Sequence, residues 1–79
     1  MIRPIPLAAA RTGTYRIVGV RMPGIARKLT SLGVFTGDTV EVIKAAPGPV
    51  IFLKGSIRIG IGRGMAFHIM VETVATETP

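Results

Sequence analysis

The residues that could carry chemistry are few and widely spaced. The chain has no cysteine and one histidine, His68, and its carboxylates are Asp38, Glu41, Glu72 and Glu77. A transition-metal site needs several imidazole, thiolate or carboxylate ligands that converge on one point, and this spacing predicts no such cluster. We therefore interpret His68 as a structural histidine and expect neither a metal site nor a cofactor.

Nucleophilic catalysis is not predicted either. It requires a nucleophile with a base beside it and a third group that orients the base. The serines, Ser31 and Ser56, lie in no recognisable nucleophile elbow, and the carboxylates are scattered. We expect no catalytic residues, and we predict that the chain is not an enzyme.

Three glycines at alternate positions, Gly60, Gly62 and Gly64, invite comparison with phosphate-binding loops. The dinucleotide-binding fingerprint has a different spacing and joins a strand to a helix within a βαβ unit. A Walker loop requires Gly-Lys followed by Ser or Thr, which the sequence lacks. We interpret these glycines as residues that ease a sharp corner of the fold.

Charge is the clearest bias of the composition. Ten Lys or Arg residues against four Asp or Glu residues give a net charge of +6. This surplus indicates an acidic partner, such as a nucleic acid, an anionic membrane face or an acidic protein surface. The alternative is that it keeps a chain with 48% hydrophobic residues in solution. The basic residues are spaced along the chain, which favours a broadly positive face over a nucleic-acid-binding arm.

One short helix organises the elements that must position these side chains. Three apolar residues recur at i, i+4 and i+7, the spacing of one helix face: Ile25, Leu29 and Leu32. They predict an α-helix over about residues 24–32. Gly33 follows, where a helix commonly ends on a residue with positive φ, and Val34 can then contact Leu29. Gly37 supplies a turn before the next strand.

About five short strands surround this helix in the sequence pattern. They are predicted at residues 14–20, 38–44, 50–54, 56–61 and 68–72. Gly19 suggests a bulge in the first strand, and Ile57, Ile59 and Ile61 mark the fourth as half-buried. A helical turn is predicted at residues 62–66. The pattern predicts a mainly β fold, a small, strongly bent antiparallel barrel.

The whole chain, residues 1–79, is predicted to be one domain with its core over about residues 5–72. Pro4 and Pro6 hold residues 1–13 extended, with a turn or two at residues 7–10, and residues 73–79 form a frayed tail. The aromatic residues are interpreted as core, because their irregular positions do not suggest a groove for proline-rich peptides: Tyr15, Phe35, Phe52 and Phe67.

Five basic residues are candidates for a partner-binding surface. Arg27 lies on the outer side of the predicted helix, Lys28 on its flank, and Arg21 in the loop before it. Arg58 takes the outward face of its strand, and Arg63 lies at the glycine-rich corner. For any one of them alone, a solvated surface charge is the alternative.

The motif Leu29-x-x-Leu32-Gly33-Val34-x-x-Gly37-Asp38, followed by a β-rich run, resembles the FeoA family of small accessory proteins in bacterial and archaeal ferrous-iron uptake. Residues 58–66, with Ile69 and Val71 after them, extend the resemblance to roughly residues 5–72. The family usually has proline where this chain has Thr36. The resemblance implies an SH3-like barrel, and a protein without enzymatic activity that contacts the cytosolic part of a membrane GTPase transporter.

Other interpretations stay open at this point. The chain could be a freestanding relative of the SH3-like domain of iron-dependent repressors, or a small basic barrel that binds nucleic acid. The few aromatic residues disfavour nucleic acid, which such barrels usually stack on aromatic side chains. Self-association into a homo-oligomer is a further possibility. No apolar stretch approaches the ~20 residues of a membrane span, so we expect a cytoplasmic protein that its partner can recruit to the membrane.

Overall fold

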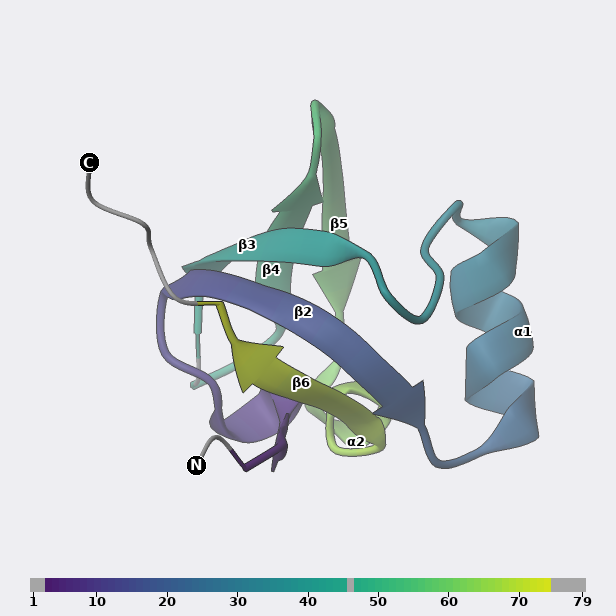
Figure 1. Ribbon diagram of the computed structural model, residues 1–79. Helices are drawn as coiled ribbons and strands as arrows, with labels where there is room; N and C mark the ends of the chain where they lie inside the picture. Colours follow the sequence, from purple (N-terminus) through teal and green to yellow (C-terminus); the bar gives the residue numbers. More distant parts are fainter. Residues whose placement is uncertain (1–2, 46, 75–79) are drawn as a thin grey trace.

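One antiparallel sheet makes up most of the fold. The computed structural model describes residues 3–45 and 47–74. Its six strands lie in the order β1-β6-β2-β3-β4-β5 (Figure 1). The elements, in chain order, are β1 (Ile5–Pro6), η1 (Leu7–Ala9), β2 (Gly13–Val20), α1 (Pro23–Ser31), β3 (Thr39–Lys44), β4 (Val50–Lys54), β5 (Ile57–Ile61), α2 (Arg63–Ala66) and β6 (Ile69–Thr73).

The period-2 pattern of the sequence builds the core. Successive side chains of a strand point to opposite faces of a sheet, and alternate residues of each long strand are buried. The inward side chains are Tyr15, Ile17, Val40, Val42, Val50, Phe52, Ile59, Ile61, Ile69 and Val71. The helices and loops add the other members of this apolar cluster, which are Leu7, Ala8, Ala10, Leu29, Val34 and Ala66. Among the described residues, no buried side chain is polar.

The sheet is strongly bent but does not close, which corrects the predicted barrel of about five strands. The sixth strand is β1, which pairs with β6 through Ile5 opposite Val71 and Pro6 opposite Met70. Two residues, one of them a proline without a backbone N–H, are too few for periodicity to reveal. β1 and β5 are the two edges of the sheet, so the ladder ends there instead of joining into a ring.

The bulge predicted at Gly19 is present. The pairing of β2 with β6 shifts register between Ile17 and Gly19. A bulge increases the local twist and bends its strand. This lets one long strand pair with β3 near its start and with β6 along its length.

The end of α1 follows the prediction closely. Gly33 has φ +85°, and the N–H groups of Gly33 and Val34 donate to the carbonyls of Thr30 and Leu29, both at 2.9 Å. This pair of bonds is a Schellman motif, which satisfies carbonyls that the last turn of a helix leaves free. Helix α1 starts and ends one residue earlier than predicted, with Pro23 in its first turn.

Some side chains expected in the core are at the surface. Leu29 is the buried residue of α1, whereas Leu32, the C-cap residue at which α1 ends, is exposed. Phe35, Phe67 and Ile57 are also exposed, so the prediction that all phenylalanines are core and that Ile57 belongs to the buried face was wrong. Each lies in a loop, just after a helix or at the end of a hairpin, where the sheet does not cover it.

The remaining predicted elements are present where the structure describes them. Helix α2 forms the helical turn expected at residues 62–66, with Gly62 as its N-cap residue. Residues 7–9 form η1, where one or two turns were expected. Thr73 ends β6 and the N–H of Val74 donates to the carbonyl of Thr14 at 3.2 Å. The rest of the predicted tail, residues 75–79, lies outside the described residues, as does Ala46.

Replacing Gly33 with valine should lower the free energy of unfolding by about 1–3 kcal/mol, because a β-branched side chain fits positive φ poorly. A Cβ at this position would meet nothing within 4 Å, so the cost is conformational and not steric. Gly24 in α1 is the matched control, since its Cβ also meets open space at negative φ, and Gly24→Ala should leave stability unchanged or higher. Equal denaturation midpoints for Gly33→Val and the wild-type chain would contradict this prediction.

Candidate partner-binding surface

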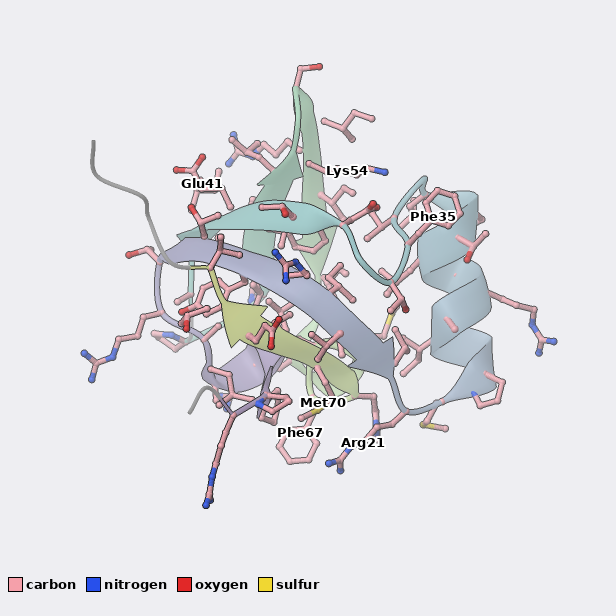
Figure 2. All side chains as sticks on the ribbon, viewed as in Figure 1. Arg21, Phe35, Glu41, Lys54, Phe67 and Met70 are labelled. Atoms are coloured by element: carbon pink, nitrogen blue, oxygen red, sulfur yellow. The ribbon has the colours of Figure 1, made fainter. Side chains whose placement is uncertain are left out.

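Lys54, the last residue of β4, joins three segments at one end of the sheet. Its ammonium donates to the carbonyl of Gly33 and forms an ion pair with Asp38, with Nζ 2.8 Å from Oδ2. The same Nζ lies 5.1 Å from the centre of the Phe35 ring, within the range of a cation–π interaction. Figure 2 shows the Lys54 side chain directed toward Phe35. The end of α1, the loop after it and β4 are thereby held together.

The register of the β4–β5 hairpin explains why Lys54 reaches this position. Val50, Phe52 and Lys54 alternate along β4, and the first two are buried. Lys54 therefore has an inward position, opposite Ile57, but at the end of the sheet where the apolar core stops. A cation at such a position needs partners, and the helix terminus and Asp38 supply them.

The loop between α1 and β3 is fixed by backbone hydrogen bonds. Asp38 N–H donates to the Phe35 carbonyl at 3.0 Å, and Gly37 has φ +99°. Together these describe a type II turn with Thr36 and Gly37 as its central residues. Gly37 N–H also donates to the Ile17 carbonyl at 2.7 Å, and Ile17 N–H donates to the Asp38 carbonyl at 2.9 Å. The turn is therefore attached to β2.

Asp38 is the acidic centre of this arrangement. Its Oδ2 accepts the Lys54 ammonium and, at 2.8 Å, the N–H of Phe35. The hydrogen bond from Lys54 is the largest influence, followed by that from Phe35, and together they lower the pKa of Asp38 below its usual 3.8. Both bonds favour the ionised carboxylate, so Asp38 contributes to the fold as an anion.

Three large exposed apolar side chains lie on the segments that contact Lys54, and we call them the hairpin patch: Leu32, Phe35 and Ile57. Their exposed fractions are 41%, 50% and 52%. Ile57 lies opposite Lys54 in the hairpin, Phe35 lies under its ammonium, and Leu32 directly precedes the carbonyl that it binds. Adjacent exposed side chains of this size commonly mark interaction sites.

Sequence reasoning missed the hairpin patch, although one signal was available. Lysine at an inward position of a strand, after buried Val50 and Phe52, predicts that the sheet is open at that end. The exposure of Phe35 was not visible in the sequence, because it depends on where the turn places the ring.

The five candidate basic residues are all exposed but do not form one cluster. Arg27 and Lys28 lie on α1, and Arg58 lies on β5 opposite Leu53. Arg21 lies at another corner, where its N–H donates to the His68 carbonyl at 2.8 Å, just after the short helix α2 that begins at Arg63. Within residues 3–45 and 47–74, none of the five forms an ion pair.

No metal-binding or substrate-binding geometry is found in the part of the chain that the structure describes. That part contains neither a group of three potential metal-ligating side chains nor a pocket. His68 is half-buried, with its ring edge-on to Phe67 at a centroid distance of 6.0 Å. Gly60, Gly62 and Gly64 form the end of β5 and the start of α2, the corner expected from the sequence.

The sequence matches the family model described as the FeoA domain over residues 5–73. The chain belongs to the FeoA family. A curated relative from Methanocaldococcus jannaschii, named "Putative Fe(2+) transport protein A", is 41% identical over 69 residues, covering 85% of this chain and 84% of the relative.

Solved structures of FeoA proteins share the fold. A crystal structure of an iron uptake regulatory protein, FeoA, superposes with a TM-score of 0.76 at 33% identity, over 89% of this chain and 96% of that one. A FeoA-like protein from Clostridium acetobutylicum gives a TM-score of 0.81 at 18% identity, over 100% of this chain and 96% of that one. The Chlorobium tepidum FeoA protein gives 0.78 at 23% identity, over 94% and 74%. The SH3-like architecture implied by the sequence is consistent with these structures.

No helix in the described part of this FeoA-family chain is long and apolar enough to cross a bilayer.

Neutralising Asp38 should reduce the acid sensitivity of the fold. A lowered folded-state pKa stabilises the native chain at pH values above the usual 3.8, and that stability is lost as pH falls through the lower folded value. Asp38→Asn should therefore melt at a lower temperature than wild type near neutral pH and lose less on acidification. Thermal midpoints at about pH 7 and about pH 3 measure this difference.

Glu41→Gln is the control for this prediction, because Glu41 is exposed and forms no ion pair among the described residues. It should keep the wild-type loss of stability in acid. The same loss in Asp38→Asn as in Glu41→Gln would show that the Lys54–Asp38 pair does not contribute.

Proposed function

We propose that this chain is a non-enzymatic interaction module that assists ferrous-iron uptake by contacting the cytosolic part of a membrane GTPase transporter. Its membership of the FeoA family supports a role in iron transport, as does its 41% identity to a relative named for Fe(2+) transport. A role in protein contact agrees with the exposed apolar and basic side chains of the described surface.

The hairpin patch is the observation that carries the proposal. Leu32, Phe35 and Ile57 come from the end of α1, the loop after it and β5. Lys54 binds the first two segments through Gly33 and Asp38, and it pairs with Ile57 in the β4–β5 hairpin. Side chains held in place before binding lose little conformational entropy on association. A preformed apolar centre of this kind is typical of protein-binding hot spots.

Basic residues of α1 adjoin the hairpin patch. Lys28 precedes Leu32 by one helical turn, so the two side chains lie on the same side of the helix. Arg27, the residue before Lys28, is also exposed. Charges at the rim of an interface mainly raise the association rate and make it salt-dependent. An acidic transporter surface would therefore be attracted to α1 and would bury the hairpin patch.

Binding can regulate the transporter only by differential affinity. A partner shifts an equilibrium between two states by as much as its binding free energy differs between them. A module of this size can thus bias the GTPase-bearing part toward the state whose surface fits the hairpin patch, without any chemistry of its own.

Ile57→Ser should weaken binding to the transporter's cytosolic domain by about tenfold or more, since loss of a central apolar contact typically costs more than 1 kcal/mol. Ile43→Ser is the matched control: Ile43 is an isoleucine of β3 with 39% exposure and lies outside the patch. Titration calorimetry measures both affinities, and circular dichroism verifies both folds. Equal affinities for the two variants would remove the hairpin patch from the interface.

Reversing the charges of Arg27 and Lys28 to glutamate should slow association and reduce its salt dependence, with folding unchanged. Surface plasmon resonance at two salt concentrations, together with iron uptake in cells, measures the effect. Normal binding and normal uptake would mean that this face is only solvated. Loss of RNA or DNA binding with transporter binding retained would favour the nucleic-acid-binding alternative.

We expect no sub-micromolar ferrous-ion site and no GTP turnover by the purified chain. The reason is the scarcity of ligating side chains and the lack of a phosphate-binding loop in the sequence. Calorimetric titration with ferrous ion and a phosphate-release assay measure the two properties. A stoichiometric metal site that disappears in His68→Ala would contradict this prediction.

A further inference from the structure

A second group of exposed residues lies at the corner formed by the end of β2 and the end of α2. We call it the corner patch: Arg21, Met22, Arg63 and Phe67. All four are exposed, and Met22 and Phe67 keep 47% and 61% of their surface accessible. Neither apolar side chain is part of the hydrophobic core, so core packing does not account for an apolar residue at either position.

Backbone contacts join the two segments that carry these four residues. Arg21 N–H donates to the His68 carbonyl at 2.8 Å, which places Met22 and Phe67 one residue beyond this bond on their respective segments. Phe67 N–H donates to the Arg63 carbonyl at 2.9 Å, so Arg63 and Phe67 are one helical turn apart and share a side of α2. Figure 2 shows Arg21 and Phe67 at the same lower edge, both directed away from the sheet.

No acidic residue of the described chain belongs to this corner. Asp38 is bound by Lys54, and Glu72 pairs with Arg16 at 3.3 Å, farther along β6. Glu41 lies on the opposite, upper side of the molecule in Figure 2. The two exposed arginines of the corner patch are therefore not compensated by a described carboxylate, and two exposed apolar side chains lie on the same two segments.

We propose that the corner patch docks the protein on the surface of an anionic phospholipid bilayer. Guanidinium groups bind phosphate oxygens through paired hydrogen bonds, so Arg21 and Arg63 fit lipid headgroups. Phe67 and Met22 would enter the boundary between headgroups and acyl chains, as the apolar faces of peripheral proteins do. Basic residues near an anionic leaflet add electrostatic attraction.

The chemistry of the corner fits an anionic lipid surface. No described carboxylate compensates its arginines, and its exposed Met22 and Phe67 can enter the boundary between headgroups and acyl chains. This proposal goes beyond the proposed transporter contact and does not depend on it, because no transporter is needed for the lipid contact.

Docking at the corner would leave the hairpin patch accessible. The strand β5 begins at the β4–β5 hairpin and is followed by α2, so the two patches lie toward opposite ends of this strand (Figure 1). A protein held at the bilayer by its corner patch would therefore present the hairpin patch away from the lipid.

Vesicle sedimentation with the purified full chain tests the proposal. The probes are phosphatidylcholine vesicles and vesicles with about one phosphatidylglycerol to two phosphatidylcholine molecules. We expect binding to the anionic vesicles only. Arg21→Glu with Arg63→Glu should reduce it by about tenfold or more. Arg27→Glu with Lys28→Glu makes the same change in net charge on α1 and should have a distinctly smaller effect. Equal losses from the two pairs would overturn the proposal, because binding would then follow net charge alone.

A fluorescence experiment tests the apolar part separately. The chain contains no tryptophan, so Phe67→Trp and Phe35→Trp each introduce one reporter at an exposed phenylalanine. Anionic vesicles should shift the emission of Phe67→Trp to shorter wavelength and leave Phe35→Trp unchanged. A shift in neither variant, or an equal shift in both, would overturn the assignment.

A protein occupant would give a different pattern. No vesicle binding at low salt, combined with loss of transporter-domain binding in Phe67→Ser, would refute the lipid contact and assign the corner patch to a protein partner. Circular dichroism on each variant verifies folding, which exposed side chains should not disturb.

Discussion

The arrangement at the open end of the sheet depends on one ammonium group. Lys54 lies where an inward-facing strand position runs past the apolar core, and its charge is compensated by the Gly33 carbonyl and the Asp38 carboxylate. Because those acceptors belong to the helix end and to the turn before β3, satisfying one cation fixes the relative positions of three segments. The partial negative charge at the C-terminal end of α1 strengthens the contact.

The apolar core of the protein makes the polar contacts of Lys54 more important. None of the described buried side chains is polar, so the core itself offers little directional information beyond shape. A domain of this size buries only about 60% of the surface of its unfolded chain. Backbone hydrogen bonds between the turn and β2, together with the Lys54 contacts, supply specificity that a thin apolar core does not.

The sequence predicted features that depend on local spacing. Alternation identified the inward residues of β3 and β5, with the exception of Ile57, and Gly33 identified the end of α1 because few other residues adopt its φ. The bulge at Gly19 was predicted for a different reason, because a glycine inside a strand often marks a bulge. Features that depend on distant segments were not predictable. They include the pairing of the two-residue strand β1 with β6 and the exposure of Leu32, Phe35 and Phe67. The five basic residues were likewise not expected to lie on separate elements instead of in one cluster.

The open sheet has a mechanical consequence. β1 and β5 are both edges, so the strands β1-β6-β2 and the strands β3-β4-β5 are connected by a single ladder, that between β2 and β3. In a closed ring, any widening breaks inter-strand hydrogen bonds. Here the two edges can separate without breaking an inter-strand hydrogen bond. Side-chain packing and the segment that contains α2, between β5 and β6, are what oppose this separation.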